Sequence, residues 1–247
     1  MTALTRAAPT IMSVTTGPED NHVPAADREA CLATGKLVDS DAPTVVEFAR
    51  RVAGEARDDA ERARRLYRAV RDGIHYDPYR IGRRPEEHSA SVTLLRGWGY
   101  CITKAALLAA AARSLGIPAR LGFADVRNHL TSDRLRRTLG TDLMVFHGYT
   151  ELHLGGRWLK ATPAFNRTLC DRIGIAPLEF NGEHDSIFQP LDVAGRRHLE
   201  YVRDRGVRLD VPFEEMWAAW REVYGTRAEG ALVDTGDWRD FEREART

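Results

Sequence analysis

The sequence predicts a globular fold that combines helices and β-strands in one main domain. Apolar residues recur at helical spacing between residues 43 and 73, and the Ala- and Leu-rich segment 102–115 is apolar on nearly all sides. Further along, two strand-like segments flank a Gly-Gly dipeptide, which is typical of a β-hairpin. With 247 residues, 43% of them hydrophobic, the chain is long enough to bury the core of such a domain.

Two helices are expected in the first third of the chain. Pro43 occupies a first-turn position of the first helix, where its missing N–H is harmless. Asp58 or Asp59 can cap the second helix, which ends at Gly73. The following polar segment, up to His88, is expected to be a loop.

The middle of the chain has the clearest signals. The helix at 102–115 is expected to lie in the core, and Gly116 and Pro118 stop it. The elements predicted after it are a strand at 119–124, a short capped helix at 132–140, and strands at 143–154 and 157–162.

The ends carry weaker patterns. Residues 1–40 are expected to form an N-terminal arm, residues 41–224 the single domain, and residues 225–247 a C-terminal tail. Aromatic residues at helical spacing after Pro212 predict a helix docked on the core.

Composition excludes several classes of protein. Lys and Arg number 36 and Asp and Glu number 36, so the net charge of zero lacks the basic excess of a nucleic-acid binder. No apolar run approaches the ~20 residues that span a bilayer, and no signal peptide is recognised. Three cysteines without CxxC spacing form neither a disulfide framework nor a zinc site, so a cytoplasmic location is predicted, with no metal and no cofactor.

Cys101 is the first candidate for chemistry. It begins the predicted core helix, directly after Gly97-Trp98-Gly99-Tyr100. Unpaired N–H groups and the helix dipole at such a position favour a thiolate, so a lowered pKa is expected. A small apolar role at the helix–loop junction is the alternative.

His147 is the candidate base for this thiol. Alternation along 143–154 places it on one strand face with Tyr149, Glu151 and His153. It follows Cys101 by about 45 residues, an order in which a Cys–His pair can assemble. His153 competes, but it lies roughly 20 Å further along an extended strand, beside the turn.

The predicted hairpin suggests a third member. If Gly155-Gly156 is a two-residue loop, Leu154 pairs with Arg157 and Ala164 lies opposite His147. Thr162 is then diagonal to His147 on the same face, where its hydroxyl could orient the imidazole.

The segments GYCITKAALLAAAARSLGIPARLGFAD and HGYTELHLGGRWLKATPAFN resemble the core of the transglutaminase-like superfamily, over residues 60–166. The resemblance implies an α+β papain-like fold, in which a buried helix carrying the nucleophile packs on an antiparallel sheet carrying the base. It assigns the nucleophile to Cys101 and the general base to His147. Thr162 stands where the family pattern has an orienting Asp, and Asp142, Asn128 or Asn166 could substitute for it.

The expected activity is cysteine-dependent acyl transfer through a thioacyl-enzyme, from an amide, ester or thioester to an amine or water. The substrate would be a peptide, an amino-acid derivative or another small acyl compound. Trp98, Tyr100, Asn128 and Tyr149 are the candidate substrate-binding residues. A cysteine protease or amidase on the same fold is the first alternative, and a catalytically impaired scaffold or binding protein is the second.

Overall fold

The computed structural model describes residues 25–129, 132–188, 198–225 and 241 of the chain. Its helices are α1 (Ala25–Ala30), α2 (Pro43–Ala53), α3 (Asp59–Gly73), the 3₁₀ turn η1 (Pro85–His88), α4 (Ala90–Arg96), α5 (Cys101–Ser114), α6 (Asp133–Leu139), α7 (Arg167–Ile173) and α8 (Phe213–Tyr224). Its strands are β1 (His75–Tyr76), β2 (Trp98–Gly99), β3 (Ala119–Asn128), β4 (Leu143–Leu154), β5 (Arg157–Ala161) and β6 (Leu199–Arg208). The fold class is α+β, as predicted.

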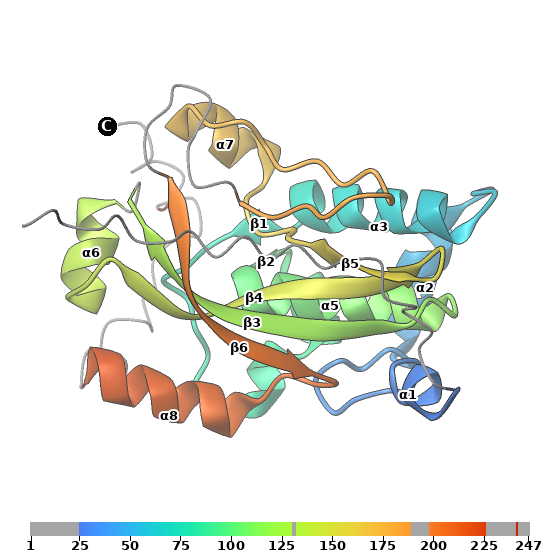
Figure 1. Cartoon of the computed structure of the whole chain (residues 1–247), viewed down its shortest axis with the longest axis horizontal. Coiled ribbons are helices and arrows are strands. Elements are labelled where there is room, and N and C mark those ends of the chain that lie inside the picture. The colour runs from blue at the N-terminus through green and yellow to red at the C-terminus, as the bar shows by residue number, and fades with distance from the viewer. Residues whose placement is uncertain (1–24, 130–131, 189–197, 226–240, 242–247) are drawn as a thin grey trace, which may run out of the picture.

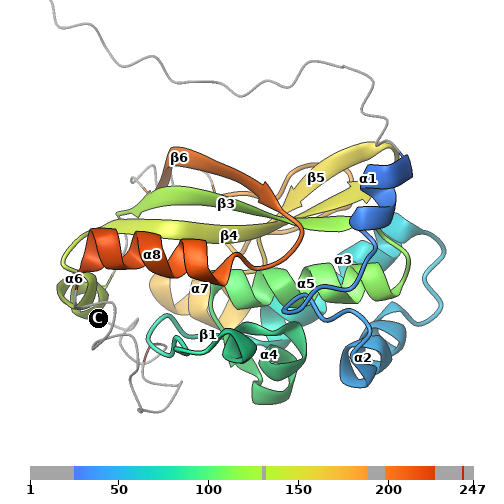
Figure 2. The ribbon, with the colours of Figure 1, turned by 90° about the horizontal axis from the view of Figure 1, so that it is seen from below.

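The main sheet is antiparallel, with the strand order β5-β4-β3-β6. Helices α2, α3, α4 and α5 lie together on one side of it (Figure 2), and α8 runs beside the sheet near β6 (Figure 1). Gly155 and Gly156 both have positive φ and close the predicted hairpin, in which Leu154 pairs with Arg157.

Helix α5 is the centre of the core. Every residue from Cys101 to Arg113 is buried, which explains why the helix is apolar on nearly all sides. Thr150 ties this helix to β4, because its hydroxyl donates to the carbonyl of Ala105 at 2.8 Å. The helix is therefore held against the strand that carries His147.

Part of the predicted N-terminal arm belongs to the packed body. Leu37 and Val38 are buried, and the Asp210 carboxylate accepts hydrogen bonds from their backbone N–H groups. The packed body thus begins before residue 41, the start that the sequence indicates. Residues 1–24 of the arm, and all of the tail beyond Gly225 except Phe241, lie outside the described residues.

The strand β6 was not expected from the sequence. Its residues are mostly exposed and strongly charged, so it shows no apolar alternation. It is placed by backbone pairing with β3. An edge strand of this kind is specified by its neighbour and leaves little trace in its own sequence.

Candidate active site

Cys101 lies at the first position of α5, where the sequence placed it. The preceding residues are positioned by β2, which pairs in parallel with β1, so that Tyr76 lies opposite Gly99. This pairing brings Tyr76, from a segment predicted as loop, beside the start of the core helix.

Gly148 allows β4 to approach this helix end closely. A Cβ atom on Gly148 would lie 2.9 Å from the Cα of Ile102, which is too close for any side chain. The absence of a side chain lets the backbone N–H of Gly148 interact with the Cys101 thiol. The residue after His147 thus fixes the distance between strand and nucleophile.

The Cys101 thiol does not have the lowered pKa that its helix position suggests. Burial raises its pKa to about 11, and the backbone N–H groups of Gly148, Ile102 and Cys101 offset only part of this effect. The sequence-based expectation of a lowered pKa is therefore wrong for this structure. Cys101 is buried, and removing a thiolate from water costs more free energy than the N–H groups at the helix end provide.

A β-bulge lies directly before His147. Ala124 pairs with His147 and Val126 with Met144, so Val145 and Phe146 together oppose one residue, Asp125. Phe146 has a φ of 61°, the only positive φ among the described non-glycine residues. The bulge interrupts the regular alternation that the sequence analysis assumed along β4.

Side chains from two other elements hold this bulge. The Asp125 carboxylate on β3 accepts from the Phe146 N–H at 3.0 Å and from Nε of Arg205 at 2.5 Å. From α8, the Tyr224 hydroxyl accepts from the Val145 N–H at 2.7 Å, and the Trp220 indole donates to the Val145 carbonyl at 2.8 Å. These bonds satisfy backbone groups that the bulge removes from the strand ladder.

The His147 imidazole is buried and electrically neutral at pH 7. Burial lowers its pKa to about 4. Its Nε2 atom has no hydrogen-bond partner among the described residues, and its ring contacts that of Phe188 at 5.8 Å between centroids. The thiol of Cys101 and the imidazole of His147 are therefore both neutral at rest.

Thr162 is buried, and its hydroxyl oxygen also lacks a partner among the described residues. The predicted pairing of Ala164 with His147 is wrong, because the ladder between β4 and β5 ends at Thr150 and Ala161. Thr162 instead donates its backbone N–H to the carbonyl of Ser186 at 3.0 Å, and Pro163 has no N–H to continue the ladder. The structure shows no hydrogen bond between Thr162 and His147.

None of the three substitutes considered for the family Asp is bonded to the free Nε2 of His147. Asn166 is engaged elsewhere, since its side-chain oxygen accepts from the Tyr76 N–H and its nitrogen donates to Thr168. The carboxylate of Asp142 lies 3.8 Å from Arg127, and Asn128 lines the cavity described next.

Cys101 and His147 line the same small cavity, whose volume is about 60 Å³. Helix α6 contributes Leu135 and Leu139 to its wall, and α8 contributes Trp220 and Tyr224. The other described residues that line it are Tyr76, Pro78, Ile81, Tyr100, Val126, Asn128, Met144, Val145, Phe146, Phe165 and Leu199. Such a mostly apolar space with a few polar groups is typical of a small-molecule site.

Two of the four predicted substrate-binding residues, Tyr100 and Asn128, line this cavity, and the other two do not. The guanidinium groups of Arg80 and Arg96 lie 5.3 and 5.1 Å from the ring centroid of Trp98. Tyr149 packs over Gly122, with the Lys160 ammonium 5.3 Å from its ring. The walls formed by α6 and α8 were missed, because nothing local in the sequence links these helices to Cys101.

His153, the competing histidine, does not line the cavity and packs against Trp158 near the hairpin. Cys31 and Cys170 are buried free thiols at other places in the core. Within the described residues, no three His, Cys, Asp or Glu side chains are grouped to hold a metal ion. No helix in the described ranges is long and apolar enough to cross a membrane.

Comparison with known proteins relates the middle of the chain to a known family. Residues 46–163, which include Cys101, His147 and Thr162, match the sequence model of the transglutaminase-like superfamily. No curated protein sequence is significantly similar to the chain. One similar solved structure is that of a provisionally assigned cysteine protease from Cytophaga hutchinsonii, with 18% identity and a TM-score of 0.48. The match covers 80% of this chain but 54% of that protein, so the chain spans about half its length.

Proposed function

Because this chain, over residues 46–163, belongs to the transglutaminase-like superfamily, we propose that it is an enzyme that transfers acyl groups through a thioester on Cys101. One observation carries the proposal: Cys101 and His147 line one cavity, although they come from a helix and a strand far apart in the sequence. Cysteine-based catalysis is the chemistry for which such a pair is suited.

The first step is attack of Cys101 Sγ on the carbonyl carbon of an amide, ester or thioester. An S–C bond forms while the thiol proton moves to the imidazole of His147. The two pKa values, about 11 for the thiol and about 4 for the imidazole, mean that neither group is charged beforehand. His147 therefore acts as a general base during the attack, and no thiolate is stored at rest.

The second step breaks the bond to the leaving group, which takes the proton from His147. The resulting thioester is cleaved by an amine, which yields a new amide, or by water, which yields a carboxylic acid. His147 accepts a proton from the amine or the water and returns one to the sulfur.

The developing oxyanion needs two donors, and the Cys101 backbone N–H is the first. We assign the second to the Tyr76 hydroxyl. Tyr76, Tyr100 and Tyr224 all line the cavity, burial raises the pKa of each, and Cys101 contributes electrostatically in all three cases.

Only one of these three hydroxyls is free among the described residues. Tyr100 bonds His88 Nδ1 at 2.7 Å, and Tyr224 bonds the backbone of Val145 and Leu143. The Tyr76 hydroxyl makes no hydrogen bond to any residue that the structure describes. Strand β1 places Tyr76 opposite Gly99, two positions before the nucleophile. A donor without a partner is available to a charge that appears only during the reaction.

The test is mass spectrometry of the protein after incubation with an activated acyl donor such as p-nitrophenyl butyrate. We expect one butyryl group on Cys101 that hydroxylamine removes. Cys101→Ala should form no adduct, whereas Cys170→Ala, which deletes another buried thiol, should form it as the wild type does.

Adding methylamine separates transfer from hydrolysis, because transfer yields N-methylbutyramide and hydrolysis yields butyrate. Absence of any adduct on Cys101 would contradict the proposal. It would favour the alternative that the protein is a catalytically impaired scaffold or binding protein. The lack of a partner for His147 Nε2 among the described residues also fits that alternative.

A further inference from the structure

Within the described part of the chain, no charged side chain lines the cavity that holds Cys101 and His147. None of its seventeen described lining residues is Asp, Glu, Lys or Arg, and eleven of them are aliphatic, proline, methionine, phenylalanine or tryptophan. In a chain with 29% charged residues this is a strong local bias. An ionised group placed here would lose its hydration and find no counter-charge.

The short helix α6 also presents apolar and not charged side chains to the cavity. It is fixed at its start by the Ser132 side chain, which accepts from the Leu135 N–H, and it ends at the left-handed Gly140. Its two leucines, Leu135 and Leu139, line the cavity, whereas its arginines do not. Arg134 lies instead over the ring of Tyr79, at 4.4 Å.

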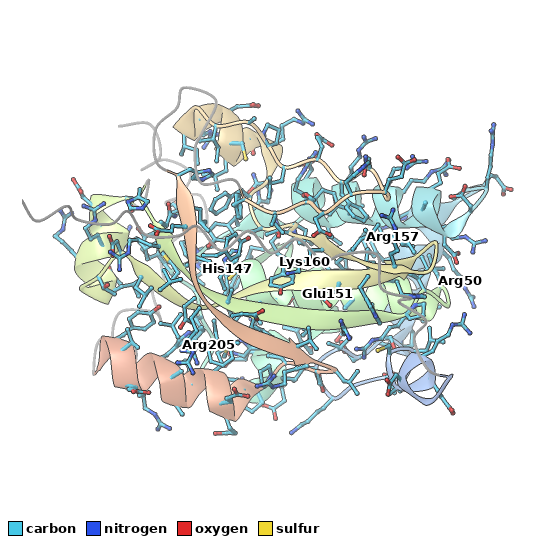
Figure 3. The ribbon with its side chains drawn as sticks, viewed as in Figure 1. Arg50, His147, Glu151, Arg157, Lys160 and Arg205 are labelled. Atoms are coloured by element: carbon cyan, nitrogen blue, oxygen red, sulfur yellow. The ribbon has the colours of Figure 1, made fainter. Side chains whose placement is uncertain are left out.

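The charged side chains of β4 and β5 lie near the hairpin that joins the two strands, away from His147. Figure 3 shows Glu151, Lys160 and Arg157 along the hairpin half of β4 and β5, whereas His147 lies toward the opposite half of β4. Glu151 is paired with Arg120 at 2.7 Å, so this carboxylate is neutralised where it stands. These charges are not oriented to receive an ionised substrate beside Cys101.

From these observations we propose that the cavity selects a short, apolar and uncharged acyl group. The proposal rests on the function above, in that the selected group is the one bonded to Cys101. The volume of about 60 Å³ limits its size, since one water occupies about 10–15 Å³ on the same scale. The carbonyl then lies at Sγ, and the hydrocarbon part lies among Leu135, Leu139 and Trp220.

Alkylation of Cys101 tests this selection without requiring acyl transfer. The probes are N-propyl iodoacetamide and N-(2-carboxyethyl) iodoacetamide, which differ by one terminal carboxylate. Each forms an S–C bond as iodide leaves and the thiol proton goes to the solvent or to His147. The rate at Cys101 is read by peptide mass spectrometry and divided by the rate of the same cysteine in urea-unfolded protein.

We expect the propyl probe to react with folded Cys101 at least tenfold faster than the carboxyethyl probe after this normalisation. Leu139→Lys places a cation in the cavity wall and should lower the ratio of the propyl rate to the carboxyethyl rate, or bring it below one. Leu95→Lys adds the same charge to a side chain that is 72% exposed, and should leave the ratio unchanged. The wild-type ratio alone decides the question if Leu139→Lys does not fold.

Equal normalised rates for the two probes, or resistance of Cys101 to both, would overturn the inference. The proposed function is judged separately by p-nitrophenyl butyrate. A thioester on Cys101 together with equal rates for the two probes would support acyl transfer and contradict selection of an apolar acyl group. A probe preference without any thioester would establish an apolar pocket and contradict acyl transfer.

Discussion

The two central residues are buried in their neutral forms, and this sets the expected pH dependence. Since burial raises the pKa of Cys101 to about 11, the thiolate fraction at pH 7 is small and grows tenfold with each pH unit. The rate constant for iodoacetamide at Cys101 should therefore rise steadily from pH 7 to 10. A plateau beginning below pH 7 would instead indicate a stable thiolate–imidazolium pair.

Thr162 offers a test of the missing carboxylate. Its hydroxyl has no hydrogen-bond partner among the described residues, so Thr162→Ala should leave the pH profile of Cys101 alkylation unchanged. Thr162→Asp places a negative charge where the family pattern has one, which should raise the pKa of His147 and increase Cys101 alkylation at pH 7. Equal alkylation rates of Cys101 in the two variants would mean that a charge at position 162 does not affect the pKa of the imidazole.

Tyr76→Phe tests the second oxyanion donor. Loss of one such donor typically lowers turnover about 100-fold or more. Because alkylation creates no oxyanion, the iodoacetamide rate at Cys101 should stay within about twofold of wild type. Tyr201→Phe, which removes a hydroxyl outside the cavity, should change neither rate. A parallel fall of turnover and alkylation in Tyr76→Phe would indicate a structural role.

At the scale of elements, the bulge in β4 is the feature that sequence patterns could not supply. Period-two alternation assigns His147 to a strand correctly but has no means of showing an inserted residue. The groups that hold it, Asp125 and Tyr224, come from β3 and α8. The aromatic stripe of α8 correctly predicts a docked helix. The hydrogen bonds of Trp220 and Tyr224 to the Val145 backbone depend on the tertiary structure and could not be predicted from this stripe.

Tyr224→Phe measures what the bulge contributes. The substitution leaves the Val145 N–H without its acceptor, a loss of about 1–3 kcal/mol in the free energy of unfolding. Val223→Ala on the same helix, at a side chain that is 40% exposed, should cost less than about 0.5 kcal/mol. Urea denaturation of both variants provides the comparison, and equal midpoints would mean that the bulge does not depend on this bond.

For the whole molecule, the sequence was sufficient for the core helix and the hairpin, because each has a local pattern. The pairing of Cys101 with His147 stays a prediction, which their position on one cavity supports. The sequence was insufficient for β6, for the α6 and α8 walls, and for the pKa of Cys101, because these depend on contacts between distant segments. Burial in particular is a property of the assembled fold, and it reversed the expected pKa shift. The cytoplasmic location inferred from cysteine usage stays a prediction.

Neutral burial of His147 also affects the stability of the whole domain. Its folded pKa of about 4 lies below the unfolded value of 6.5, so the folded state binds fewer protons between these values. The free energy of unfolding is therefore highest above pH 6.5. It falls as the pH drops from 6.5 toward 4, because the unfolded state gains a proton that the folded state does not bind. Relative to His147→Gln, the wild type should lose about 3 kcal/mol of unfolding free energy over this range, as measured by urea denaturation. A constant difference between the two proteins would contradict the buried neutral imidazole.

The central claim is that Cys101 and His147 act together, with the imidazole removing a proton from a neutral thiol. Its most direct test is the acylation rate of Cys101 by p-nitrophenyl butyrate in the wild type and in His147→Ala, measured from pH 7 to 11. We predict that the wild type is about 100-fold faster or more at pH 7 and that the two rates converge near pH 11, where the thiol ionises without help. Equal rates at pH 7, or a ratio that does not change with pH, would contradict the account.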